Sequence, residues 1–204
     1  MCFTHNIVSY FDYMKKIFII ILTTCHFFYA LGQKISSDSS LTSLTKLDLG
    51  LQGVGFSYEP RISNKITIDL SAGVGGGYNI FEGGVDYTWN LLRPALYFMV
   101  TPKFYYNRKR RIEKGKKFQN NSGNYFGVRL KYTTENNSSD YNYRVYQSGL
   151  INLHWGIQRP VGKKWILNAH AGAGYATNIG GRFGTIYPAL ELKFSYLFKK
   201  SQVQ

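Results

Sequence analysis

Long stretches of this chain alternate apolar side chains with small or polar ones at every second residue. Strict alternation predicts β-strands, because successive side chains on a strand point to opposite faces of the sheet. In a clear example, Ile66, Ile68 and Leu70 alternate with Thr67 and Asp69. Seven such segments occur, at about 47–58, 66–74, 96–106, 126–132, 151–157, 165–175 and 186–198. The chain is therefore expected to be all-β.

The length and composition of these segments favour a barrel that crosses a membrane. Soluble strands usually have about 5 to 6 residues, whereas roughly 9 to 11 are needed to cross a bilayer at a tilt. The non-apolar face carries Gly, Ser, Thr and Asn with few charges, which suits a narrow lumen. The predicted fold is a transmembrane antiparallel up-and-down β-barrel. A soluble lipocalin-like barrel with its apolar face turned inward remains an alternative.

Aromatic residues gather near the ends of the segments, as expected for the two girdles at the membrane interfaces. A preference of aromatics for strands in general would also place them there. The predicted girdles are Tyr58, Tyr105, Tyr106, Tyr125 and Phe198 on one side, and Tyr78, Tyr132, Tyr143 and Tyr187 on the other.

The strand number is predicted to be eight, although seven segments are evident. Bacterial barrels have even strand numbers, and an even number returns both chain ends to the periplasm. The missing strand is expected either from residues 35–53, through a turn near Gln52 and Gly53, or from Phe81 to Trp89.

Short turns containing Pro60 and Pro160 predict the orientation, because short connections of such barrels lie in the periplasm. The outer loops are then 79–90, 134–142 and 178–185, and the connection 107–122 is periplasmic.

The amino-terminal region predicts export. Lys15 and Lys16 precede an apolar run that is short for a spanning helix and ends in small residues, as in a secretory signal peptide cleaved after Gly32. Translation starting at Met14 and lipidation of Cys25 are open alternatives. The predicted divisions are a signal peptide at 1–32, a polar leader at 33–44, the barrel at 45–198 and a short basic tail at 199–204. The expected location is the outer membrane of a Gram-negative bacterium.

The chain is strongly basic, with a formal net charge of +14. Export makes nucleic acid an improbable partner, so lipid head groups and the phosphates of lipopolysaccharide are the expected anions. A connection rich in basic residues predicts an anion-binding element, and a solvated connection is the alternative. Its members are Arg108, Lys109, Arg110, Arg111, Lys114, Lys116 and Lys117.

Charged and histidine side chains on the polar faces predict a network inside the lumen. Its expected members are Asp48, Asp69, Arg129, Lys131, Arg144, His154, His170, Glu191 and Lys193. The interior of an eight-stranded barrel is only wide enough for its own side chains, so a wide pore is not expected. His154 and His170 lie within a diagonal of each other on adjacent strands. A lipid A hydrolase using such a histidine with Ser148 or Ser195 is an alternative, but no nucleophile has a persuasive spacing. The prediction is no enzyme, metal or cofactor.

The chain resembles the small outer-membrane β-barrel proteins of Bacteroidetes-type bacteria. The resemblance is carried by the Gly-rich hairpins, the run Pro102–Asn107, the segment Asn121–Tyr125 and the closing run Pro188–Phe198. It implies a membrane barrel that the barrel-assembly machinery recognises through a final strand ending at Phe198, and it assigns no reaction. Six residues after Phe198 depart from the usual terminal aromatic. A monomer with a structural, adhesive, small-solute or lipid-related role is expected.

Overall fold

The computed structural model describes residues 40–82, 84–89, 92–116, 118–136, 138, 144–181 and 184–201. The predicted signal peptide and the first part of the polar leader lie outside these residues. No helix within the described part is long and apolar enough to cross a membrane.

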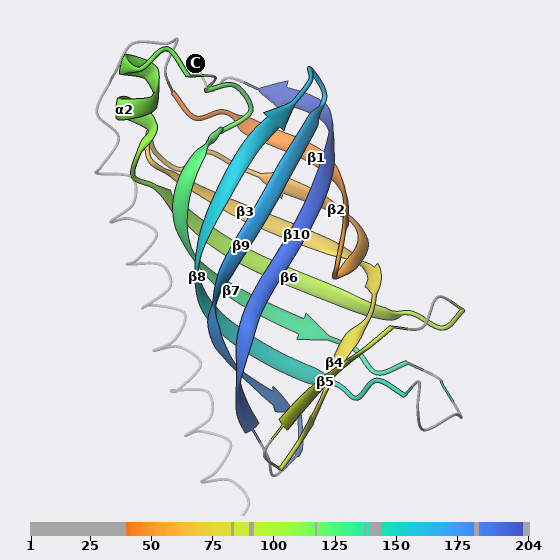
Figure 1. Ribbon diagram of the computed structural model, residues 1–204. Helices are drawn as coiled ribbons and strands as arrows, with labels where there is room; N and C mark the ends of the chain where they lie inside the picture. Colours follow the sequence, from red (N-terminus) through yellow and green to blue (C-terminus); the bar gives the residue numbers. More distant parts are fainter. Residues whose placement is uncertain are drawn as a thin grey trace, which may run out of the picture. The chain divides into compact units, whose positions relative to one another are not determined.

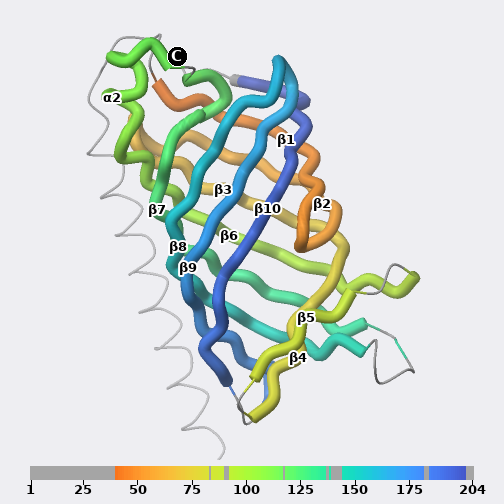
Figure 2. Tube along the Cα trace, viewed as in Figure 1, coloured from red at the N-terminus to blue at the C-terminus, as the bar shows by residue number. Residues whose placement is uncertain are grey.

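Eight antiparallel strands form a closed barrel in the order β1-β10-β9-β8-β7-β6-β3-β2 (Figures 1 and 2). This confirms the predicted fold and strand number. The barrel strands are β1 (Ser43–Gly50), β2 (Gly53–Glu59), β3 (Ile66–Gly75), β6 (Ala95–Tyr105), β7 (Gly123–Thr133), β8 (Ser148–Val161), β9 (Trp165–Asn178) and β10 (Gly184–Ser201).

The eighth strand is β1, the first of the two predicted sources. It is separated from β2 by a turn at Leu51 and Gln52, and Gly53 follows with a φ of +126° that a side chain would disfavour. The second source, Phe81 to Trp89, contributes to a separate hairpin. Its strands are β4 (Gly77–Phe81) and β5 (Gly84–Thr88), which pair only with each other.

The alternation of the sequence becomes the inside and outside of the barrel. Along β6, Leu96 and Phe98 are exposed on the outer wall, whereas Tyr97 and Met99 are buried. The same period holds in β7 and β8, where the large apolar residues other than Tyr125 and Leu150 face outward and the polar ones face inward. The predicted assignment of apolar side chains to the outer wall agrees with this arrangement.

The two ends of the barrel differ in their connections. The first strand begins and the last strand ends at one end, which also carries the short helix α2 (Arg108–Glu113); we call it the α2 end (Figure 1). The β2–β3 and β8–β9 turns are at this end too. The opposite end carries the β4–β5 hairpin, and we call it the hairpin end.

The strands are unequal in length, so the barrel wall is shorter at β1 and β2 than at β9 and β10. Strand β1 pairs with β10 only from Lys193 to Ser201, and the first half of β10 pairs with β9 alone. Pro188 lies in that half, where the absence of an N–H donor is tolerated on a strand edge. The hairpin lies beside this edge, and the Tyr87 hydroxyl donates a hydrogen bond to the Leu51 carbonyl at 2.8 Å.

Several aromatic residues assigned to the girdles lie inside the barrel. Tyr105, Tyr125 and Tyr187 are at most 3% exposed and pack in the lumen, because each has the sequence parity of the inward face. Tyr58, Tyr106 and Phe198 are exposed as predicted, and Tyr143 lies outside the described residues.

The barrel also extends beyond its predicted carboxyl boundary. Lys199 and Lys200, assigned to a basic tail, belong to β10 and pair with Thr45 and Leu44.

Candidate functional site

A buried network of charges fills the α2 half of the lumen. The Lys46 ammonium lies 2.6 Å from Glu59 Oε2 and 3.3 Å from Asp69 Oδ2. Lys103 contacts the same two carboxylates, at 2.7 Å from Asp69 and 3.4 Å from Glu59. Two cations thus share two anions, and hydroxyls of Thr67 and other residues complete the hydrogen bonding.

A third lysine extends this network around the barrel. Lys193 Nζ lies 2.8 Å from Asp48 Oδ2 and 3.5 Å from Asp69 Oδ2. The hydroxyl of Ser195 donates to the other oxygen of Asp48 at 2.6 Å. Every one of these side chains comes from the inward positions of β1, β3 and β10, so strand register brings them together.

A second ion pair lies further toward the hairpin end. Arg129 on β7 donates to Glu191 Oε2 on β10 at 2.6 Å and to the Thr101 hydroxyl at 3.3 Å. His170 Nδ1 lies 3.4 Å from the same Glu191 oxygen. The pair spans the lumen, because β7 and β10 are separated by two strands in the barrel order.

The two predicted histidines lie together in the lumen. Their rings are stacked with centroids 3.9 Å apart, and the Tyr125 ring packs against His154 at right angles. His154 Nδ1 lies 2.7 Å from Asn152 Oδ1. Gly127 faces the ring on the next strand, and a Cβ there would lie 2.4 Å from His154 Nε2.

Lys131 is a buried cation of a different kind. It donates to Gln52 Oε1, and its ammonium lies 5.3 Å from the ring centres of both Tyr78 and Tyr97. Within the described part of the chain, no carboxylate lies within ion-pair distance of it.

Eight of the nine residues predicted to form the lumen network are buried there. The exception is Arg144, which is exposed in the β7–β8 connection with its guanidinium over the Tyr146 ring. It lies outside any barrel strand, so strand alternation does not apply to it. Lys46, Glu59 and Lys103 are further members of the network that were not predicted, although all three continue the inward parity of their strands.

Residues from the segment before β1 and from the β6–β7 connection close the lumen at the α2 end. Leu41 packs against Tyr105 and Tyr125, and all three are almost fully buried. Asn121 accepts from the Thr42 N–H at 2.9 Å and donates to the Thr42 carbonyl at 2.8 Å. Asn121 has a φ of 55°, a left-handed conformation that asparagine tolerates better than most residues.

Arg108 joins these two closing segments. Its guanidinium donates to the carbonyl oxygens of Ser40 and Ser122, both at 3.3 Å. Burial lowers the pKa of the Arg108 guanidinium from its ordinary value. This residue of the predicted anion-binding element therefore has a structural position.

The β4–β5 hairpin closes the opposite end. Ile80 packs against Leu150, Ala176 and Tyr187 inside the barrel mouth, and Asn178 donates to the Ile80 carbonyl at 2.8 Å. A cavity of about 10 Å³ lies beneath the hairpin, lined in part by Lys131. This volume holds no more than about one water molecule.

The hydrolase alternative would require a serine near a lumen histidine. Ser195 Oγ instead donates to Asp48, and Ser148 Oγ is buried without a hydrogen bond. Among the described residues, no group of three or more His, Cys, Asp or Glu side chains is arranged to hold a metal ion.

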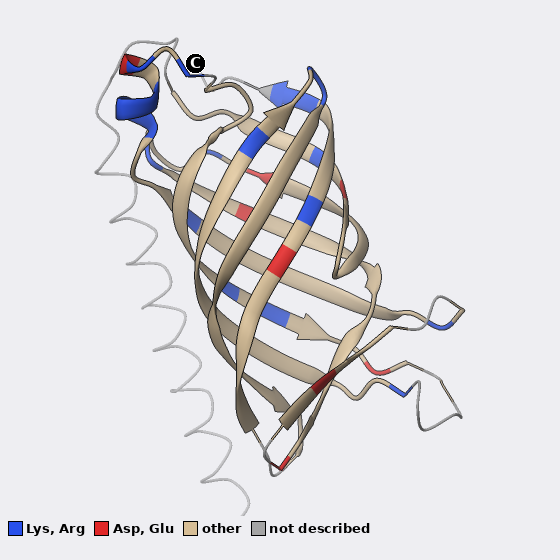
Figure 3. Cartoon of the chain, viewed as in Figure 1, with Lys and Arg blue, Asp and Glu red and all other residues tan. Residues whose placement is uncertain are grey.

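The remaining described residues of the basic connection lie on or beside α2 (Figure 3). Arg110, Arg111, Lys114 and Lys116 line a cavity of about 400 Å³ together with Arg159 of β8. Lys109 points elsewhere, 4.0 Å from Glu113, and Lys117 lies outside the described residues.

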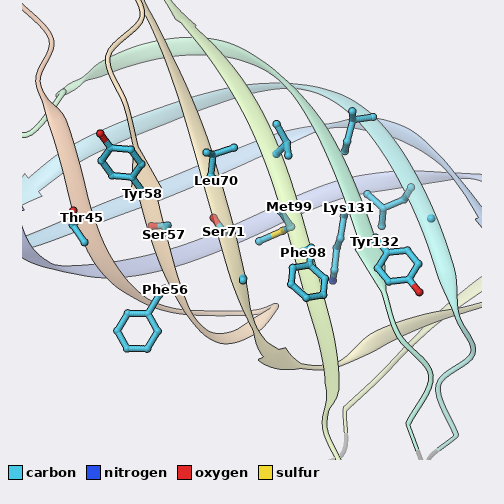
Figure 4. A pocket seen from close by; sticks show the side chains of 15 residues that line it. Thr45, Phe56, Ser57, Tyr58, Leu70, Ser71, Phe98, Met99, Lys131 and Tyr132 are labelled. Carbon is cyan, nitrogen blue, oxygen red and sulfur yellow. The ribbon is translucent and has the colours of Figure 1, made fainter. Parts of the chain in front are cut away.

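The outer wall carries an apolar hollow of about 740 Å³ that extends from β1 across β2, β3, β6 and β7 to β8 (Figure 4). Phe56 and Phe98 both pair in register with Ala72. The small side chain of Ala72 leaves a depression in the outer surface between the two rings.

No protein family model and no curated protein matches the chain. Among solved structures, the chain is similar to the outer membrane protein AlkL, determined by solid-state NMR in DMPC lipid bilayers. The two share 13% sequence identity and a TM-score of 0.40, over 84% of this chain and 97% of that one. This distant likeness establishes neither a family nor a function.

Proposed function

We propose that the protein is an integral outer-membrane β-barrel whose lumen is sealed. Its role in the membrane is structural, and the residues at the two ends of the barrel make its contacts with other molecules. We also propose that it is neither an enzyme nor a pore, and that it is a monomer, because β1 and β10 close the barrel within one chain. The resemblance to the Bacteroidetes-type family remains part of this proposal.

The observation that carries the proposal is the inverted distribution of charged and apolar residues. Four acidic and five basic side chains are buried in the described lumen, whereas the wall exposes large apolar residues. The buried acidic and basic residues are Lys46, Asp48, Glu59, Asp69, Lys103, Arg129, Lys131, Glu191 and Lys193. Exposed apolar surface on this scale fits contact with hydrocarbon rather than water.

The filled lumen argues against transport and against an apolar ligand. Ion pairs span the interior, and residue contacts close both ends. A lipocalin-like carrier needs an apolar cavity, but polar and charged side chains occupy the central section here.

Fractionation and conductance together test the proposal. The protein should be in the membrane fraction, dissolve only with detergent and shift its gel mobility on heating. In planar bilayers it should give no stable channel steps, with a bacterial porin as the positive control. Release into the periplasm without detergent would favour the soluble barrel, and stable conductance would contradict the sealed lumen.

A separate measurement tests the proposal that the protein is not an enzyme. Purified protein in detergent should leave lipid A unchanged by mass spectrometry. Loss of an acyl chain that disappears in His154→Ala or His170→Ala would support the hydrolase instead.

A further inference from the structure

We propose that the basic cavity at the α2 end binds the phosphate of an anionic glycerophospholipid from the adjacent leaflet. The proposal rests on the membrane insertion proposed above. It assigns the cavity a defined ligand and includes Arg159, which lies far from the basic connection in sequence.

The cavity combines several cations with polar groups suited to an anion. Its lining contains Arg110, Arg111, Lys114, Lys116 and Arg159, and none of the described residues that line it is acidic. Arginine and lysine together suit phosphate, because guanidinium groups can donate two parallel hydrogen bonds to its oxygens.

The base of the cavity is held in place by hydrogen bonds. Arg159 donates to the carbonyl of Gly123 at 2.7 Å and to the Oδ1 of Asn124. Asn107 in turn accepts from the Asn124 N–H at 2.7 Å. Backbone and amide oxygens thus orient Arg159 without neutralising its charge.

The acidic residue of the basic connection does not contribute to the cavity. Glu113 lies on the exposed side of α2, where its partner is Lys109. The cavity therefore concentrates positive charge on one side of the helix.

The position of Tyr106 favours a lipid over a soluble anion. Tyr106 lines the cavity, and its hydroxyl also accepts a hydrogen bond from Trp155 Nε1 on the outer wall at 2.7 Å. Its ring packs 5.3 Å from Phe126, and all three aromatics are exposed. Tyrosine and tryptophan prefer the head-group level of a bilayer. A phosphate in the cavity would thus leave the acyl chains against the apolar wall of β7 and β8.

Native mass spectrometry of the detergent-purified protein tests this assignment, with phosphatidylglycerol as the probe. The pocket variant combines Arg110→Gln, Lys114→Gln and Lys116→Gln, which are all exposed positions. The control combines Lys65→Gln, Lys109→Gln and Lys163→Gln, which remove the same charge at the same end from exposed positions outside the cavity lining.

The wild type and the control should each retain one phosphatidylglycerol. The pocket variant should bind it about a hundredfold more weakly, since each basic residue near an anionic surface contributes roughly a fivefold factor. Equal weakening in the control would mean that only overall charge matters, and would overturn the assignment.

Two further probes separate the possible ligands. Competition by millimolar inorganic phosphate with no advantage for the lipid would make the site a free-anion site. Equal retention of oleate would remove the requirement for phosphate, and either result would overturn the proposal. Heat-dependent gel mobility confirms folding of each variant, so a folded, membrane-inserted barrel without lipid retention contradicts this inference alone.

Discussion

His154 and His170 stack in the lumen with their ring centroids 3.9 Å apart. They lie diagonally across β8 and β9, because His154 pairs with Gly172 and His170 with Gly156. Gly127 and Gly172 leave space for His154, and Gly156 leaves space for the Tyr125 ring that packs against it. The arrangement therefore depends on small residues in adjacent strands as much as on the histidines.

We expect Gly127→Ala to destabilise the barrel by about 1 to 3 kcal/mol. The added Cβ would lie 2.4 Å from His154 Nε2, and the ring cannot retreat freely because His170 and Tyr125 pack against it. Urea unfolding in lipid vesicles measures the loss. Gly149→Ala on β8 is the control, since a Cβ there meets nothing within 4 Å. Equal stability of the two variants would show that the histidine pair is loosely packed.

The second prediction concerns the outer wall. Leu192→Arg or Val128→Arg should lower the free energy of unfolding by roughly 2 to 4 kcal/mol, because each places a charge near the middle of the membrane. Val161→Arg, near the α2 end of its strand, should cost only about 0 to 1 kcal/mol. The same vesicle unfolding experiment reports all three. A neutral Leu192→Arg would mean that this wall does not face lipid.

The third prediction separates two kinds of buried charge. Asp69→Asn should destabilise the barrel by about 3 to 5 kcal/mol, because it removes a carboxylate shared by Lys46, Lys103 and Lys193. Lys131→Met should be neutral or stabilising, because no described carboxylate compensates that buried cation. The midpoints and slopes of urea unfolding, measured for both variants under the same conditions, check the direction of each change in stability. A large loss of stability in Lys131→Met would mean that the contacts of the Lys131 ammonium with Tyr78 and Tyr97 stabilise the barrel.

The barrel could be predicted from the sequence because burial follows a period of two over long strands. The same rule explains the errors. Tyr105 and Tyr125 were assigned to a girdle from their place at strand ends, but their odd positions point into the lumen in β6 and β7. Parity would also have identified Lys46 beside Asp48, and Glu59 beside Ser57.

Other features depend on tertiary contacts that alternation does not encode. The closure of the lumen by Leu41 and Asn121 joins segments about 80 residues apart. The entry of Ile80 into the barrel mouth depends on how the hairpin folds back, and Arg159 reaches the basic cavity only through the β7–β8 pairing. These contacts could not be read from the pattern of one strand.

The fourth prediction concerns closure and assembly. Deleting residues 196–204 should leave an unfolded, protease-sensitive chain, because it removes the part of β10 that pairs with Ser43 to Leu47. Deleting only residues 202–204 should be tolerated, since the β1–β10 pairing ends at Ser201. Heat-dependent gel mobility and protease resistance distinguish the two chains. Normal mobility of the longer deletion would mean that neither closure nor recognition by the assembly machinery requires Phe198.

The last prediction concerns the side of the membrane on which α2 lies. The first strand begins and the last strand ends at the α2 end. In a bacterial barrel with an even number of strands, both chain ends lie in the periplasm. A cysteine at Lys114 would be the only thiol of a mature chain that begins after Gly32, since Cys2 and Cys25 precede that point. It should resist an impermeant thiol reagent on intact cells and react after lysis. A cysteine at Glu135, exposed in the β7–β8 connection at the hairpin end, is the matched control and should react on intact cells. Reversed labelling would place α2 outside the cell, and would change the expected ligand of its basic cavity from a glycerophospholipid to lipopolysaccharide.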